Sequence, residues 1–185
     1  MDHAADAQKL TSGKIILVLP TAADEAEAAA YQAEHTAHGE AWLHGSGGLA
    51  RMPYREWLAL SLGNMRPETV QPGLVPATTF FARRAEDGKF IGMIQVRHIL
   101  NEYLLQYGGH IGYGVRPSER RKGYATQMLR LALQYCVGLG LRHVLVTCDR
   151  DNLGSSRTIR ACGGILENEV MEENGELLQR YWITL

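Results

Sequence analysis

The stretch VRPSERRKGYAT, residues 115–126, joins a predicted strand to a predicted helix and decides how the rest of the chain is read. The residues before it alternate as in a short strand, with Tyr113 and Val115 on one face. After it, apolar residues recur at helical spacing from Ala125 to about Leu139, which predicts a helix with one buried stripe. A strand, a basic loop and a helix in this order place the helix N-terminus at the loop.

Three cations and a glycine precede this helix, namely Arg120, Arg121, Lys122 and Gly123. Cations at a helix N-terminus oppose the helix dipole and cost roughly 0.3–1 kcal/mol each, so the helix alone does not explain them. The first N–H groups of a helix lack intrahelical partners, and a glycine lets an anion approach them closely. The stretch therefore predicts a phosphate site, with a pyrophosphate as the best fit. A solvated basic turn is the alternative.

The remaining hydrophobic patterns predict a mixed α/β fold in one domain. Strands are expected at residues 14–20, 110–115 and 142–148, in a hairpin over 77–100 and in a second hairpin over 165–185. Helices are expected at residues 21–39, 54–65, 125–139 and 152–164. The helix over 54–65 should bury Trp57, Leu58 and Leu62. The strand–helix–strand order in the middle predicts a parallel crossover, whereas the hairpins predict antiparallel pairing.

Length and composition limit the classes of protein that fit. The 185 residues carry a formal net charge of -1, with 45% hydrophobic, 21% charged and 8% aromatic residues, which is ordinary for a globular protein and too neutral for a nucleic-acid binder. Three cysteines without a C-x-x-C pair argue against a disulfide framework and a metal site. Neither a signal pattern nor a membrane-length apolar run occurs, so we expect a cytoplasmic protein without a membrane partner. We expect a flexible N-terminus over residues 1–13 and one domain over 14–185.

The motif resembles the acyl-CoA signature of the GNAT N-acetyltransferase superfamily, whose core is R/Q-x-x-G-x-G/A. Arg120, Gly123 and Ala125 match that core, and Asn152 at the start of the next helix fits the same family. The resemblance covers roughly Lys89 to Leu185 well and the N-terminal third loosely. It is closest to a group of bacterial predicted acetyltransferases that share GGHIGYGVRPSERRKGYA. It implies a single GNAT-type domain with a mixed, splayed central sheet flanked by helices.

The resemblance also implies acetyl-CoA as the cosubstrate and a place for it. Family members splay two parallel strands, here Ile111–Val115 and His143–Cys148, and bind the pantetheine arm on exposed backbone groups of the first. Gly112 and Gly114 suit a bulged strand that a ligand approaches closely, and a weak edge strand is the alternative. The expected cofactor-binding residues are Tyr113, Gly114, Val115, Arg120, Arg121, Lys122, Gly123, Tyr124, Ala125 and Asn152.

The acid that protonates the departing thiolate is less clear from the sequence. In much of the family it is a tyrosine seven residues after the helix-opening asparagine, but Ile159 occupies that place here and has no proton to donate. Ser155 on the first turn of the same helix and Tyr124 are the substitutes we expect. Ser156 and Cys148 are further candidates. Ser155 could equally be a helix-start hydrogen bonder, and Cys148 a core residue.

His110, at the start of the splayed strand, is the candidate base, because its pKa class suits proton abstraction near neutral pH. A structural histidine and a water chain are the alternatives. The predicted function is acetyl transfer from acetyl-CoA to a primary amine by direct attack. No motif specifies the acceptor, which is a small molecule or a peptide, and a homodimer stays open. The alternative function is a non-catalytic acyl-CoA-binding or sensing domain, which the missing tyrosine favours.

Overall fold

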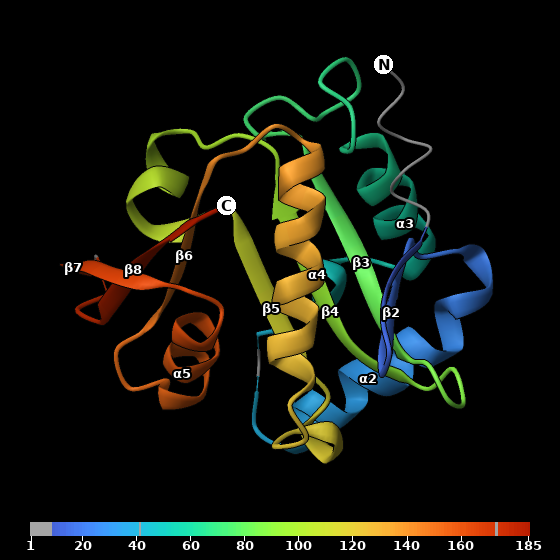
Figure 1. Cartoon of the computed structure of the whole chain (residues 1–185). Coiled ribbons are helices and arrows are strands. Elements are labelled where there is room, and N and C mark those ends of the chain that lie inside the picture. The colour runs from blue at the N-terminus through green and yellow to red at the C-terminus, as the bar shows by residue number, and fades with distance from the viewer. Residues whose placement is uncertain (1–8, 41, 173) are drawn as a thin grey trace.

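The helix that follows the basic turn crosses one face of a five-stranded sheet, and a second sheet lies beside it (Figure 1). The computed structural model describes residues 9–40, 42–172 and 174–185. The five strands are, in spatial order, β1 (Lys9–Ser12), β2 (Ile15–Val18), β3 (Ala77–Arg84), β4 (Phe90–Arg97) and β5 (Ile111–Val115). The second sheet has the order β6 (His143–Asp149), β8 (Leu177–Thr184) and β7 (Ile165–Met171). Neighbours in each sheet pair antiparallel.

In the part of the chain that the structure describes, four helices and four short turns connect the strands. The helices are α2 (Glu25–Ala37), α3 (Tyr54–Gly63), α4 (Tyr124–Gly138) and α5 (Leu153–Ala161). The short turns are η1 (Ala22–Asp24), η2 (Leu49–Arg51), η3 (Leu104–Gly108) and η4 (Pro117–Glu119). Thr21, the first residue of the helix predicted over 21–39, is the N-cap of η1, where its N–H and hydroxyl both donate to the Asp24 carboxylate at 2.7 and 2.9 Å.

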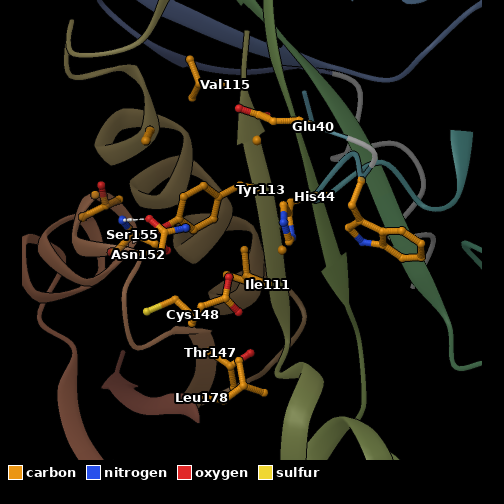
Figure 2. A pocket seen from close by; sticks show the side chains of 18 of the residues that line it. Glu40, His44, Ile111, Tyr113, Val115, Thr147, Cys148, Asn152, Ser155 and Leu178 are labelled. Carbon is orange, nitrogen blue, oxygen red and sulfur yellow. Dashed lines mark hydrogen bonds between the residues drawn. The ribbon is translucent and has the colours of Figure 1, made fainter. Parts of the chain in front are cut away.

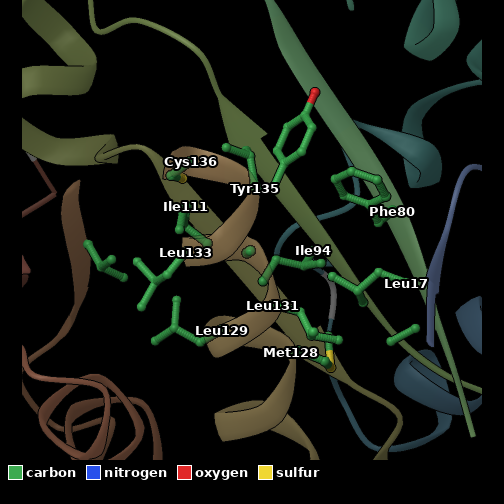
Figure 3. Packing of buried hydrophobic residues seen from close by; sticks show 14 of the residues in the cluster. Leu17, Phe80, Ile94, Ile111, Met128, Leu129, Leu131, Leu133, Tyr135 and Cys136 are labelled. Carbon is green, nitrogen blue, oxygen red and sulfur yellow. The ribbon is translucent and has the colours of Figure 1, made fainter. Parts of the chain in front are cut away.

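Helix α4 buries its predicted stripe against the five-stranded sheet (Figure 3). Met128, Leu129 and Ala132 are fully buried and belong to one cluster with Phe80 of β3 and Ile94 of β4. The Tyr135 ring meets Phe80 edge-on at 5.1 Å between centroids. This cluster fixes α4 on the sheet, so the basic turn at its start is held at the end of β5.

Helices α2 and α3 cover the opposite face of the same sheet with an aromatic cluster. Trp57 of α3 stacks on Phe81 at 5.7 Å between centroids, and its indole N–H donates to the Ser46 carbonyl at 2.7 Å. Leu62, predicted to share the buried side with Trp57, is instead 42% exposed. Ser61 takes the buried place, because α3 is turned so that Tyr54, Trp57 and Ser61 face the sheet.

The two sheets meet at one end of β5 and diverge from there. The His110 N–H donates to the Leu145 carbonyl of β6 at 2.7 Å, and the Leu145 N–H donates to the His110 ring Nδ1 at 2.9 Å. Strands β5 and β6 run in the same direction (Figure 1), yet no ladder joins them in the described residues. The mixed, splayed arrangement predicted from the sequence is confirmed, and its parallel pair is the one that separates.

The N-terminal segment differs from the expectation of a flexible stretch up to residue 13. Lys9 to Ser12 pair with β2 as strand β1, and the Ser12 hydroxyl donates to Gln127 of α4 at 3.1 Å. Strand β2 needs a partner on its open edge, which this segment supplies. Residues 1–8 lie outside the described residues.

Leu129→Ala should lower the free energy of unfolding by roughly 2–5 kcal/mol, because it removes a fully buried side chain from the cluster under α4. Val137→Ala on the last turn of the same helix is the matched control, since Val137 is 59% exposed. We expect a change within about 0.5 kcal/mol there. Urea unfolding followed by circular dichroism measures both, and equal losses would contradict the packing described.

Candidate functional site

A cleft of about 1240 Å³ lies where β5 and β6 diverge. Figure 2 shows Tyr113 of β5 reaching toward Asn152 and Ser155 of the other wall, with Cys148 and Thr147 of β6 beside them. The basic turn closes one end of the cleft. The other end is lined by Tyr103 and Tyr107 around η3 and by the β7–β8 turn with Glu172, Asn174 and Glu176. The cleft therefore joins an anion-attracting end to an open, aromatic and acidic end.

The cleft side of β5 presents backbone groups that β4 does not use. Arg116 N–H donates to the Ile91 carbonyl and Arg97 N–H to the His110 carbonyl, both at 2.8 Å. Antiparallel strands bond to one neighbour at every second residue, so the even-numbered residues of β5 serve β4. The backbone groups of Ile111, Tyr113 and Val115 therefore point toward β6.

Gly114 differs from the two binding residues predicted beside it, because its backbone pairs with Met93 of β4. Because Gly114 has no side chain, another backbone segment can approach it closely. A Cβ at Gly114 would lie 2.9 Å from the His44 carbonyl, and one at Gly45 would lie 2.5 Å from the Gly112 carbonyl. The glycines of β5 thus admit the loop before η2, not a bulge, since the register between the described strands β4 and β5 is unbroken.

The basic turn has the backbone conformation of an anion-binding loop. Arg121 and Gly123 both have positive φ, at 65° and 80°, and Gly123 is the N-cap of α4. Alternating left-handed residues direct successive N–H groups into one concavity. Tyr124 and Ala125 line the cleft on the first turn of α4, where N–H groups have no intrahelical acceptor.

Two of the three cations in this turn are held by carboxylates of the protein. The Arg120 guanidinium binds Glu40 through two hydrogen bonds of 2.5 and 2.7 Å and donates from Nε to the Val115 carbonyl at 3.0 Å. This pairing lowers the pKa of Glu40 to about 2. Lys122 binds Glu119 at 2.8 Å. Within the described part of the chain, Arg121 alone of the three has no hydrogen-bond or ion-pair partner, so it is the cation most free to meet a ligand.

Ser155 and Tyr113 meet across the cleft. The Asn152 side chain caps α5 by accepting from the Ser155 N–H at 3.0 Å, as the sequence predicted for a helix-opening residue. The Ser155 Oγ and the Tyr113 hydroxyl lie 2.8 Å apart and share a hydrogen bond. Burial raises the pKa of Tyr113 above its ordinary value, so the phenol keeps its proton. Ile159 is fully buried and belongs to the core cluster.

The other candidates from the sequence have structural partners. His110 is buried, its Nδ1 accepts the Leu145 N–H, and burial lowers its pKa to about 4. It therefore has the structural role of joining the two sheets. Cys148 is buried with its pKa raised to about 11 by burial. The Ser156 Oγ pairs with Tyr181 at 2.9 Å, and the Tyr124 hydroxyl lies beside Arg84.

Sequence reasoning did not single out three residues that line this part of the cleft. His44 is exposed in the cleft on the opposite side of β5 from Tyr113 (Figure 2). Trp42 also lines the cleft, and the Arg51 guanidinium lies 4.3 Å from its ring centroid. Arg97 lines the same region. No sequence signal could have found them, because a loop and a strand end far apart in the chain meet only in the folded sheet.

Two further features concern ligands and membranes. Among the described residues no group of three or more His, Cys, Asp or Glu side chains is placed to hold a metal ion. No described helix combines the length and apolar character needed to cross a bilayer.

Comparison with known proteins finds one matching family model and many solved structures with a similar fold. Residues 14–165 match the family model of the acetyltransferase (GNAT) domain. No curated protein matches the sequence. A ribosomal-protein-S5-alanine acetyltransferase from Vibrio fischeri is 17% identical, with a TM-score of 0.71 and coverage of 95% of this chain and 96% of that one. RimJ of Mycobacterium smegmatis in complex with CoA-disulfide is 20% identical, with a TM-score of 0.68 and coverage of 92% and 81%. The microcin C7 self-immunity acetyltransferase in complex with acetyl-CoA and AMP is 18% identical, with a TM-score of 0.69 and coverage of 94% of both chains.

Glu119→Gln should destabilise the turn before α4, because this buried carboxylate binds Lys89 at 2.5 Å and Lys122 at 2.8 Å. We expect a loss of roughly 1–3 kcal/mol at neutral pH. The two lysines lower the pKa of Glu119 from 4.5 to about 2 in the folded protein. The carboxylate therefore stabilises the fold above about pH 4.5, and this contribution disappears as the pH falls toward 2.

Urea unfolding of the wild type and the variant between pH 7 and pH 2.5 measures this difference. The difference in the free energy of unfolding between the wild type and the variant should decrease steadily below pH 4.5. Glu86→Gln, at an exposed position of the β3–β4 turn, is the control and should match the wild type throughout. A difference that stays constant down to pH 2.5 would show that the ion pairs do not carry the effect.

Proposed function

Because the chain belongs to the GNAT acetyltransferase family and is an acetyl-CoA-dependent N-acetyltransferase, we propose that acetyl-CoA lies along the cleft between β5 and β6. The observation that carries this proposal is the combination of an anion-binding turn at one end of the cleft and an unused strand edge along its wall. The acceptor amine then enters from the open end at η3. The pyrophosphate and the pantetheine arm of the cofactor each have a complementary surface in the cleft.

The pyrophosphate binds at the turn formed by Arg120 to Ala125. Backbone N–H groups of this loop and of the first turn of α4 converge there, and the helix dipole favours negative charge. The ion pairs Arg120–Glu40 and Lys122–Glu119 support the loop geometry. Arg121 supplies the free positive charge.

The pantetheine arm binds the open edge of β5 as an added strand would. Tyr113 and Val115 direct their backbone N–H groups into the cleft, so they can donate to the amides of the arm and to the thioester carbonyl. Gly114, whose backbone serves β4, contributes by admitting the His44–Gly45 loop. Asn152 positions the other wall by capping α5.

The chemistry is a direct attack of the neutral amine on the thioester carbon. A C–N bond forms, the C–S bond breaks, and the thiolate takes a proton from Ser155, which Tyr113 can reprotonate through their shared hydrogen bond. The tyrosine enters the site from β5 and compensates for Ile159 on α5. His44, exposed in the cleft, is our candidate to receive the amine proton in place of His110.

The acceptor we propose is the N-terminal amine of a polypeptide. Several structures of the same fold carry names of enzymes that acetylate ribosomal proteins, and the open end of the cleft leaves an exit for a chain beyond its first residue. The free thiols of Cys136, Cys148 and Cys162 fit a reducing compartment such as the cytoplasm.

Gly123→Asp should abolish measurable CoA binding, because it places a carboxylate where the pyrophosphate binds. The fold should survive, since no atom lies within 4 Å of a Cβ at this exposed site. Gly140→Asp is a matched control at the other end of α4, with a φ of 81° against 80° and equally open surroundings. At CoA near 100 times Kd the wild type and this control should gain about 2.7 kcal/mol of stability. Equal gains in Gly123→Asp would leave the turn without a role in binding.

Ser155→Ala should lower kcat by roughly 10²–10⁴-fold with CoA affinity nearly unchanged, because the hydroxyl acts only on the departing thiolate. Ser156→Ala on the same helix turn is the control, since its hydroxyl pairs with Tyr181 outside the reaction. Thiol release in the presence of acetyl-CoA and an N-terminal serine peptide measures kcat. Full activity in Ser155→Ala would transfer the acid role to water or to another group.

A further inference from the structure

Arg97 lies at the acceptor end of the cleft with half of its guanidinium engaged. Its Nη1 donates to the carbonyls of Gly108 and Gly109 at 2.9 and 3.0 Å, at the C-terminal end of η3. These two bonds fix the orientation of the planar group. The Nη2 nitrogen lies 3.9 Å from the place of a Cβ on Gly112, so it borders the cleft beside β5.

The positive charge of Arg97 has no carboxylate partner in the protein. Among residues 9–40, 42–172 and 174–185, none lies within ion-pair distance of this guanidinium. Burial lowers the pKa of Arg97, and Tyr103 opposes that effect only in part. Arg97 is half-buried. Charges withdrawn from water are normally paired, so this unpaired guanidinium at the border of a cleft is suited to an anionic ligand.

The phosphates of the cofactor cannot be that anion. Arg97 sits opposite His110, before β5 begins, whereas the pyrophosphate turn follows Val115 at the other end. Five residues of strand separate the two ends, a distance of roughly 17 Å. The thioester lies between them, beside Tyr113, and only the acceptor reaches the Arg97 end.

We propose that Arg97 binds a carboxylate of the acceptor and makes the enzyme selective for amines that carry one. This inference rests on the proposed function, since it assigns a substrate class to the same cleft. The N–H groups of Nη2 and of the remaining edge of the guanidinium donate to the carboxylate, while Nη1 donates to the carbonyls at the end of η3.

The distance between the reacting amine and Arg97 limits which carboxylates of an acceptor can reach the guanidinium. From Tyr113 to the level of Ile111 the strand advances roughly 7 Å. The α-carboxylate of a free amino acid lies too close to its own amine to span this. The side chain of an acidic second residue in a peptide, or a carboxylate several bonds along a small ω-amino acid, has the necessary reach.

The acidic turn between β7 and β8 favours the opposite charge on the acceptor. Glu172 and Glu176 line the outer edge of the cleft, Asn174 donates to both at 3.4 and 3.0 Å, and no cation pairs with either in the described chain. A basic acceptor would be drawn to that edge. Arg97 lies deeper in the cleft than this exposed edge, so the acidic preference should dominate for the second residue.

Peptides that differ only at the second residue test the inference. Ser-Asp-Gly-Gly, Ser-Asn-Gly-Gly and Ser-Lys-Gly-Gly, all amidated at the C-terminus, are compared by kcat/KM from thiol release with acetyl-CoA. 4-Aminobutanoate and its neutral amide form the small-molecule arm. For the wild type we expect the Asp peptide to exceed the Asn peptide about tenfold to hundredfold.

Three variants separate recognition from structure. Arg97→Gln should lose the preference and accept the Asp and Asn peptides equally, and Arg97→Lys should keep only part of it, because the fork geometry is lost. Arg130→Gln, an exposed site on α4, should behave as the wild type. CoA binding and thermal stability of each variant show whether the fold is intact.

The outcomes are distinct. Acetylation of Asp and Asn peptides at equal rates by the wild type, or a preference for the Lys peptide, would overturn the role of Arg97 and leave the proposed function standing. A preference that survives in folded Arg97→Gln would also overturn it. If 4-aminobutanoate is acetylated faster than its amide and no peptide is acetylated, Arg97 binds the carboxylate of a small acid and the polypeptide acceptor is wrong. If no amine is acetylated, the proposed function fails and this inference fails with it.

Discussion

The structure depends on one backbone contact, the hydrogen bond from the His110 N–H to the Leu145 carbonyl. It joins two antiparallel sheets at a single point and leaves the rest of β5 facing β6 without a ladder. A continuous sheet would have satisfied those backbone groups within the protein. Because the strands separate, the groups remain for a ligand, and the cleft exists. The His110 ring reinforces the contact through Leu145, which explains a buried histidine held neutral beside a catalytic cleft.

Two sets of charges lie around the basic turn: ion pairs within the protein, and positive groups that are left for a ligand. Glu40 and Glu119 neutralise Arg120 and Lys122, so the loop is stable before any ligand arrives. The backbone conformation, with Arg121 in the left-handed region, is thereby fixed in advance. A preformed site loses little conformational freedom on binding. The positive charge offered to a ligand then comes from Arg121, the N–H groups and the helix dipole, and less from the number of basic residues in the sequence.

Ser155 and Tyr113, the pair that we propose to protonate the thiolate, come from different elements of the fold. Ile159 is buried in the core, so α5 cannot present a phenol from that position. Tyr113 reaches across from β5 and places its hydroxyl 2.8 Å from Ser155, at the first turn of α5. The opposite side of β5 is kept free of side chains by its glycines, which let the loop with His44 approach. Both faces of one short strand thus contribute to the site.

The sequence by itself determined the helices, the strands other than β1, the family and the strand–turn–helix order at the basic turn. These follow from local patterns, such as the periodicity in α4 and the spacing of Arg120, Gly123 and Ala125. It also identified Asn152 as a helix start, since capping acts over three residues. Only the tertiary structure decided that His110 joins the sheets, that Arg120 is held by Glu40, and that Tyr113 meets Ser155. It alone placed His44 and Arg97 at the acceptor end. Such contacts join residues 30 to 80 positions apart, and their geometry is set by how α4 packs on the sheet, which no local pattern encodes.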